Sequence, residues 1–155
     1  MKLDPRFLIV WSLLGVVAGA GVAQLSSGFG FAFPATDGFL ATSLAAIGIA
    51  IYAATFPIFR YRRQLEKPAS GLVKRPDPLR SYRLLVLARA VLITALGFAG
   101  WHLGQLLWLW FFSIAPQGLV SWASIGLVSS VLMYLGGLGA QYNCRLPKDP
   151  DGDSA

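Results

Sequence analysis

Four long apolar stretches occupy most of this 155-residue chain. They run over residues 7–25, 39–59, 84–112 and 119–142. A helix rises about 1.5 Å per residue, so about 20 apolar residues cross a hydrocarbon layer about 30 Å thick. Each stretch is close to that length or longer. The sequence therefore predicts an all-α fold, an integral membrane bundle of four transmembrane helices.

The composition agrees with a membrane environment. Hydrophobic residues make up 55% of the chain and charged residues 13%, which is too apolar for a soluble domain of this size. We expect one transmembrane domain over residues 1–143, interrupted by a basic loop at 60–83, and a cytoplasmic tail at 144–155. The single cysteine, Cys144, has no partner for an internal disulfide.

The basic residues indicate how the chain is oriented. Eight of the thirteen Lys and Arg residues lie between the second and third spans, whereas the connectors 26–38 and 113–118 contain none. Short loops rich in Lys and Arg stay on the cytoplasmic side, so the loop and both termini are predicted to be cytoplasmic. We expect a multi-pass protein of the cell (inner) membrane. This placement of the charge of +6 argues against a nucleic acid partner.

Basic side chains beside a span can reach anionic lipid headgroups, and each contact is worth about 1 kcal/mol near the surface. Membrane lipids with anionic headgroups are therefore expected partners. An acidic cytoplasmic protein or a phosphorylated metabolite is the alternative. The candidates for lipid or partner contact are Arg60, Arg62, Arg63, Arg80, Arg83 and Arg89. Arg89 lies six positions into the third span, and it either snorkels to the boundary or pairs within the bundle.

Two features near the first span can each be interpreted in two ways. Lys2 and Arg6 precede an apolar run, as in a signal peptide, but the run is longer than the 7–15 residues of a typical signal core, so a retained anchor is predicted. The segment Ser26–Pro34 interleaves Phe with Gly and is predicted to be non-helical. Alternation places its phenylalanines on one side, in an interfacial loop or a lid over an outward cavity.

Small residues recur at four-residue spacing in three of the spans. Apolar burial cannot drive helix association in lipid, so close van der Waals packing at small residues must do so. The predicted packing residues are Gly15, Gly19, Gly97, Gly100, Gly104, Gly126, Ser130, Gly136 and Ala140. This pattern does not distinguish packing within the chain from packing against another membrane protein or a second copy.

Polar residues in the third span form a second candidate group. Thr94, His102 and Gln105 share one helix face, which predicts a polar lining toward a second subunit, a substrate path or a proton acceptor. A lone histidine is not a zinc site, which needs at least three protein ligands, and no cofactor is expected. The spans contain no Asp or Glu, and no catalytic motif is present, so we expect no enzyme activity.

Several short motifs in the second half resemble one family. They are Asp77-Pro78, Leu87-Ala88-Arg89-Ala90, Gly97, Gly100-Trp101, Gly104 and Cys144-Arg145-Leu146-Pro147. This pattern resembles an actinobacterial four-helix membrane protein family of unknown function, of the DUF3180 type, mainly over residues 72–150. The resemblance implies a basic residue at Arg89 and an acidic residue near Gln141, where this chain departs from the family. It implies no established activity.

Three functions remain compatible with these features. The first is a non-enzymatic accessory or scaffold subunit that packs against another membrane protein through glycine-lined faces. The second is an oligomeric transporter or channel for a small solute. The third is the handling of a lipid or polyprenyl phosphate, in which the basic loop and Arg89 bind the phosphate.

The orientation can be tested by labelling. In a Cys144→Ser background, a cysteine at Arg63 or Arg80 should resist a membrane-impermeant thiol reagent in intact cells, because the basic loop is retained inside. The same cysteine should react once the membrane is permeabilised. A cysteine at Gln117 should react in intact cells. Labelling of the Arg63 position from outside would contradict the predicted topology.

Overall fold

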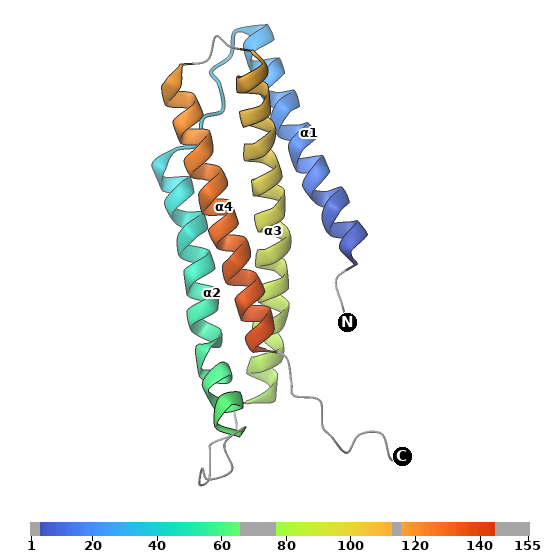
Figure 1. The fold of residues 1–155 in the computed structure, drawn as a ribbon, viewed down its shortest axis with the longest axis vertical. Coiled ribbons are helices and arrows are strands. Elements are labelled where there is room, and N and C mark those ends of the chain that lie inside the picture. The colour runs from blue at the N-terminus through green and yellow to red at the C-terminus, as the bar shows by residue number, and fades with distance from the viewer. Residues whose placement is uncertain (1–3, 66–76, 113–115, 145–155) are drawn as a thin grey trace.

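The computed structural model describes residues 4–65, 77–112 and 116–144. These residues form four helices, α1 (Pro5–Phe29), α2 (Gly38–Leu65), α3 (Pro78–Phe111) and α4 (Gln117–Asn143). Each is long and apolar enough to cross a membrane. Figure 1 shows them running up and down in turn. The predicted all-α bundle of four spanning helices is confirmed.

Proline and aspartate together set where two helices begin. Asp4 and Asp77 cap α1 and α3, and each carboxylate accepts a bond of 3.0 Å from the backbone N–H two residues on. A proline follows each cap, where its missing N–H is not needed. Because of this cap, α3 starts at Pro78, six residues before the start predicted from hydropathy at 84.

The end of α1 corrects one prediction. Residues Ser26–Phe29 are helical, although the segment 26–34 was predicted not to be. The Ser26 hydroxyl donates to the Val22 carbonyl at 2.8 Å, and Gly30 supplies the left-handed C-cap with φ of 69°. α1 therefore continues past Gly28 and ends at the Gly30 cap. We call the remaining non-helical residues, 30–37, the strap.

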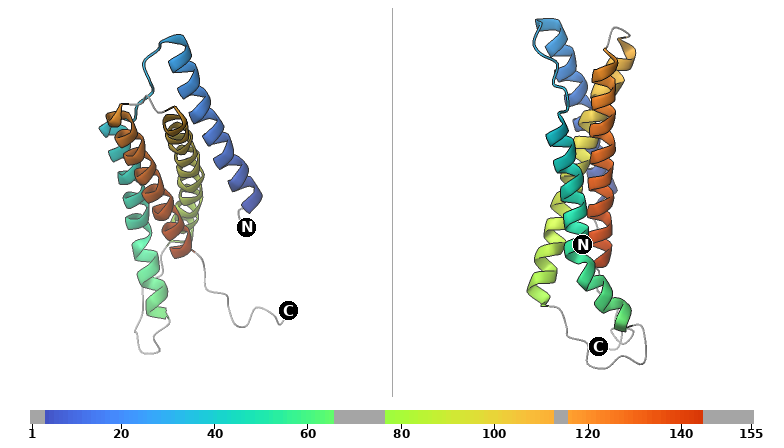
Figure 2. Two further views of the ribbon diagram at one scale, coloured as in Figure 1. Left: turned by 45° about the horizontal axis from the view of Figure 1, so that its top comes forward. Right: turned by 90° about the vertical axis from the view of Figure 1, so that its left-hand side faces the viewer.

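The helices are arranged around α3. α4 packs against both α2 and α3. Within the described residues, α1 contacts α3 and no other helix. Figure 2 shows α1 standing beside α3, away from α2 and α4. The strap therefore crosses α3 to join α1 to α2. We call this end of the bundle the connector end, and the opposite end, with Arg6, Arg60 and Arg80, the basic end.

Glycines bring the backbones of α1 and α3 into direct contact. A Cβ atom on Gly15 would lie 2.6 Å from the Gly97 carbonyl oxygen, and one on Gly19 would collide with the Trp101 carbonyl. From the other side, Gly100 and Gly104 face the α1 backbone between Ser12 and Ala20. Only glycine allows such an approach, so these residues form a seam within the chain.

A second seam joins α2 to α4. A Cβ on Gly48 would lie 2.6 Å from the Cα of Met133, and Gly136 faces the backbone of Gly48. Gly48 was not among the packing residues predicted from spacing. The buried apolar core lies beside this seam and comprises Leu44, Ile51, Ala88, Val91, Ala95, Met133 and Ala140.

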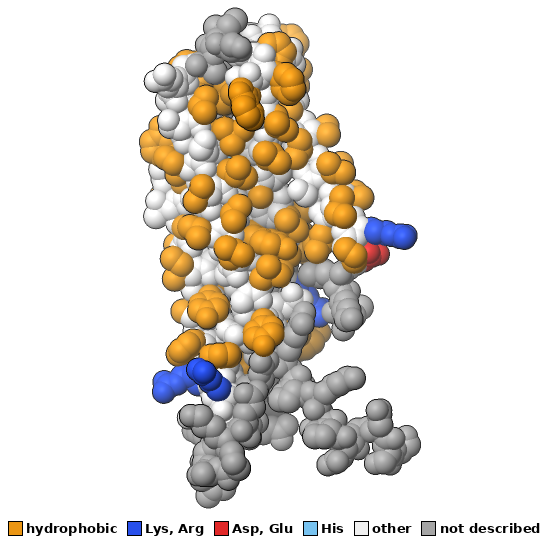
Figure 3. Space-filling model, in the orientation of Figure 1, with side chains coloured by type: hydrophobic (Ala, Val, Ile, Leu, Met, Phe, Trp, Pro, Cys, Tyr) orange, Lys and Arg blue, Asp and Glu red, His pale blue; other side chains and the backbone are white. Residues whose placement is uncertain are grey.

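The outer surface of the bundle is apolar along its length. Large exposed hydrophobic side chains occur on all four helices, and Figure 3 shows them covering the flank while Lys and Arg lie toward the basic end. Water would not tolerate this surface, whereas hydrocarbon matches it. Lipid is therefore the solvent for the flanks, and the side of the membrane that each end faces stays a prediction.

The α1–α3 seam gives a direct stability test. Gly100→Val should lower the free energy of unfolding by about 1–3 kcal/mol, because the new side chain meets the Gly15 Cα and the Val16 N at 3.1 Å. Gly21→Val is the matched control, since nothing lies within 4 Å of a Cβ there. Thermal unfolding in nanodiscs measures both. Equal loss of stability in the two variants would contradict the seam.

Candidate functional site

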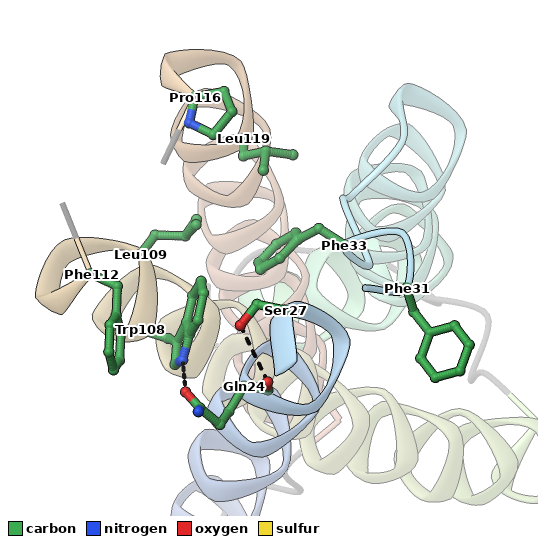
Figure 4. Close-up of a pocket in the computed structure, with 9 residues that line it drawn as sticks. All are labelled: Gln24, Ser27, Phe31, Phe33, Trp108, Leu109, Phe112, Pro116 and Leu119. Atoms are coloured by element: carbon green, nitrogen blue, oxygen red, sulfur yellow. Dashed lines mark hydrogen bonds between the residues drawn. The ribbon is translucent and has the colours of Figure 1, made fainter. Parts of the chain in front are cut away.

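A cavity of about 400 Å³ opens at the connector end. α1, the strap, α3, the residue after α3 and the start of α4 all contribute side chains to it (Figure 4). The lining residues are Gln24, Ser27, Phe31, Phe33, Trp108, Leu109, Phe112, Pro116 and Leu119. Seven of these nine are apolar, and none is charged. The cavity is thus an apolar site with a small polar rim, the usual composition of a ligand pocket.

Aromatic rings build its walls. The Phe33 and Trp108 ring centroids are 6.0 Å apart, and those of Trp108 and Phe112 are 5.0 Å apart. Both spacings fall within the range of favourable aromatic pairs. Phe31, by contrast, is largely exposed and points away from Phe33 in Figure 4. The phenylalanines therefore do not share one side as alternation predicted, and only Phe33 closes over the bundle.

Gln24 is the main polar group at this cavity. The Trp108 indole Nε1 donates to the Gln24 side-chain oxygen Oε1 at 2.7 Å. The Ser27 hydroxyl donates to the Gln24 backbone carbonyl at 3.3 Å. The Trp108 bond links α1 to α3 at the cavity and fixes how the Gln24 amide is turned, whereas the Ser27 bond lies within α1.

A buried polar cluster lies next to the cavity, toward the basic end. His102, Gln105 and Ser130 are all fully buried. His102 Nδ1 lies 2.7 Å from the Phe98 carbonyl oxygen, which can only accept, so Nδ1 carries the proton. Ser130 Oγ donates to the Gly126 carbonyl at 2.8 Å and lies 3.2 Å from His102 Nδ1. This cluster ties α3 to α4.

The same cluster holds the strap. Gln105 Nε2 donates to the Pro34 carbonyl oxygen at 2.9 Å. Thr36 is buried nearby, since a Cβ on Gly126 would lie 2.9 Å from its hydroxyl oxygen and 2.5 Å from His102 Nε2. Phe33 is the residue before Pro34, so the Gln105 bond positions the aromatic wall of the cavity.

Two acceptor atoms in this cluster lack a partner within the described residues. They are His102 Nε2 and Gln105 Oε1, both buried. An unsatisfied buried polar atom costs about 1–3 kcal/mol. The Nδ1 proton of His102 is already directed at Phe98, which leaves Nε2 as a bare lone pair against Gly126. The buried polar cluster that holds the strap therefore keeps two hydrogen-bond acceptors that no described residue satisfies.

The structure does not bring Thr94 to His102 and Gln105. Thr94 is exposed, while the other two are fully buried. Thr94 lies eleven residues before Gln105, about 16 Å along the axis, beyond the part of α3 that the strap covers. The three side chains thus do not form one lining, and the two buried ones face protein rather than an aqueous path.

The predicted basic contacts are placed as follows. Arg60, Arg63, Arg80 and Arg83 are exposed at the basic end, and Arg89 is half-buried on α3. The side chain of Arg62 lies outside the part of the chain that the structure describes. Within the described ranges no group of three His, Cys, Asp or Glu side chains could hold a metal ion.

The basic end also has a buried polar contact. Asn143 Nδ2 donates to Thr55 Oγ1 at 3.2 Å and links α4 to α2. Cys144 follows α4, and burial raises the pKa of its thiol, so the thiol stays protonated at neutral pH. Neither group lies near the cavity.

The sequence prediction did not identify the cavity residues as a site. One alternative placed the phenylalanines of residues 26–34 in a lid over an outward cavity, but neither Gln24 nor Trp108 was named as part of a site. The signals present in the sequence were the phenylalanines between glycines and the single amide late in the first span. They become a site only when α1 is placed beside the end of α3.

Comparison with family models finds a match over most of the chain. The model of a family described as "Protein of unknown function (DUF3180)" matches residues 8–148, which include the cavity, the strap and the polar cluster. No protein with curated annotation and no solved structure matches the chain.

Gly126 provides a test of the polar cluster. Gly126→Ala should destabilise the protein by about 1–3 kcal/mol although alanine favours helices, because the methyl group lies 2.5 Å from the His102 ring. Gly118→Ala in the same helix is the control, since nothing lies within 4 Å of its Cβ. Thermal unfolding in nanodiscs distinguishes them. A Gly126→Ala protein at least as stable as wild type would refute the contact.

Proposed function

We propose that this chain, which belongs to the DUF3180 family of proteins of unknown function, binds the hydrocarbon chain of a membrane amphiphile in the cavity at the connector end. It does so as a multi-pass membrane protein and without catalysing a reaction. The observation that carries the proposal is a preformed apolar cavity with aromatic walls in a bundle that lipid surrounds.

The size of the cavity supports a chain as the occupant. A water-sized group takes about 30 Å³, so about 400 Å³ has room for about a dozen non-hydrogen atoms. Pockets that bind small ligands begin at about 300 Å³. The walls are side chains with few rotatable bonds, such as Phe33 and Trp108, which keep the space open without a ligand.

The surroundings support an amphiphile from the bilayer. Large exposed side chains at the connector end include Phe31, Trp110 and Phe111, and exposed aromatics of this kind anchor at the interface between hydrocarbon and water. The cavity therefore opens where lipid molecules are the most abundant apolar species. Among the described lining residues, an aqueous solute would find only the Gln24 and Ser27 side chains to replace its hydration.

The geometry gives less support to an accessory or scaffold subunit and to a transporter or channel. The glycine faces that motivated an accessory or scaffold subunit are occupied within the chain by the α1–α3 and α2–α4 seams. A transporter or channel lined by Thr94, His102 and Gln105 gains no support either, because these residues are not brought together. A phosphate site at the basic loop involves residues outside the described ranges.

The proposal can be tested by cross-linking in nanodiscs. A methyl ester of a twelve-carbon fatty acid with a diazirine on its chain should label residues 24–33 and 108–119 preferentially. Leu109→Trp, which fills the cavity, should reduce this labelling at least tenfold, and Leu119→Trp serves as a second filling variant. Leu103→Trp, at an exposed position of the same helix, is the matched control.

Thermal unfolding of each variant establishes that it is folded before its labelling is compared. Labelling spread evenly along the apolar flanks, or equal in the filled and control variants, would overturn the proposal.

A further inference from the structure

We infer that the amphiphile bound in this cavity carries a hydrogen-bond-accepting polar group, an ester carbonyl, carboxylate or phosphate oxygen, and that Gln24 selects it. This inference rests on the proposed function and adds the chemistry of the ligand's polar part.

The orientation of the Gln24 amide follows from its neighbour. An indole N–H can donate and cannot accept, so the atom 2.7 Å from Trp108 Nε1 must be the amide oxygen. The oxygen and nitrogen of an amide are otherwise hard to assign, and here the bonding partner settles it. The Nε2 group, with two N–H donors, is therefore turned away from the indole.

No other group of the described chain uses these donors. Gln24 is exposed, and its side chain bonds only to Trp108 among the described residues. Among the described residues that line the cavity, Ser27 is the one further polar side chain, and its hydroxyl hydrogen is directed at the Gln24 carbonyl. The described residues of the rim thus offer amide donors and no carboxylate. An oxygen acceptor is matched there, while an ammonium group would lack a counter-charge.

The position of Gln24 along the membrane normal agrees with this chemistry. It lies five residues before the end of α1, about 8 Å from the connector end of that helix. The aromatic side chains of the same end mark the interface, where the ester and phosphate oxygens of lipids are located. A chain in the cavity can therefore keep its polar oxygen beside Gln24.

Selectivity must come from this polar contact. Lipid tails are as apolar as the cavity, so moving a chain from the bilayer into it changes the hydrophobic free energy little. Chain packing can hold any amphiphile of suitable size, but only the amide donors distinguish one polar group from another.

Competition against the diazirine probe in nanodiscs tests the inference. Four twelve-carbon competitors differ only in their ends: methyl laurate, dodecyl phosphate, dodecylammonium and dodecane. On the wild-type protein, methyl laurate or dodecyl phosphate should displace the probe at least tenfold more effectively than dodecylammonium or dodecane. This ratio corresponds to about 1.4 kcal/mol. The better of the first two identifies an ester or a phosphate as the bound oxygen.

Gln24→Glu should reverse this preference. The variant keeps an oxygen that accepts from Trp108 but replaces the donor group with a second carboxylate oxygen, so dodecylammonium should become the best competitor. Gln117→Glu is the matched control, because it adds the same charge at the same end outside the cavity lining. It should retain the wild-type order.

The outcomes separate this inference from the function on which it rests. Equal displacement by all four competitors, unchanged in Gln24→Glu, would overturn the role of Gln24 while leaving chain binding intact. Failure of every competitor to displace the probe would overturn chain binding itself.

Discussion

Direct contact between helix backbones is the interaction on which this structure depends. In hydrocarbon, burying apolar side chains gives little gain over lipid contact, so close packing has to hold the helices together. Gly15 and Gly19 let α1 lie against the α3 backbone, and Gly48 and Gly136 do the same for α2 and α4. Since α1 contacts no other helix in the described part of the chain, the position of Gln24 beside Trp108 depends on the contacts between α1 and α3, of which this seam is the closest.

The arrangement of the helices explains how the cavity forms at the connector end. α1 and α2 are consecutive but lie on different sides of α3, so the strap has to cross α3 to join them. The strap covers α3 at Gln105 and carries Phe33 against Trp108, which closes one side of the space. Toward the basic end no described segment crosses the same face, and Thr94 is exposed there.

Hydropathy was enough to predict the four helices, because it acts locally along each span. The helical residues Ser26–Phe29 were missed because a cap depends on the one glycine that adopts a left-handed conformation, here Gly30 rather than Gly28. The placement of Thr94 was missed for a different reason. Helix periodicity gives the face of a residue but not whether another segment covers that face at that height. The cavity needs contributions from segments far apart in the sequence, so no local pattern encodes it.

An apolar cavity in a membrane protein raises a question that a soluble protein does not face. Its walls cannot be held in place by the hydrophobic effect, because lipid would solvate Phe33 or Trp108 equally well. Directional bonds hold them instead, and among the described side chains Gln105 Nε2 holds the strap at Pro34, while Gln24 Oε1 holds the Trp108 indole. Two acceptors beside the strap have no partner among the described residues, which shows that this anchoring has a cost. Without these bonds lipid could enter and deform the space, so the polar groups around it are what give an apolar site a definite shape.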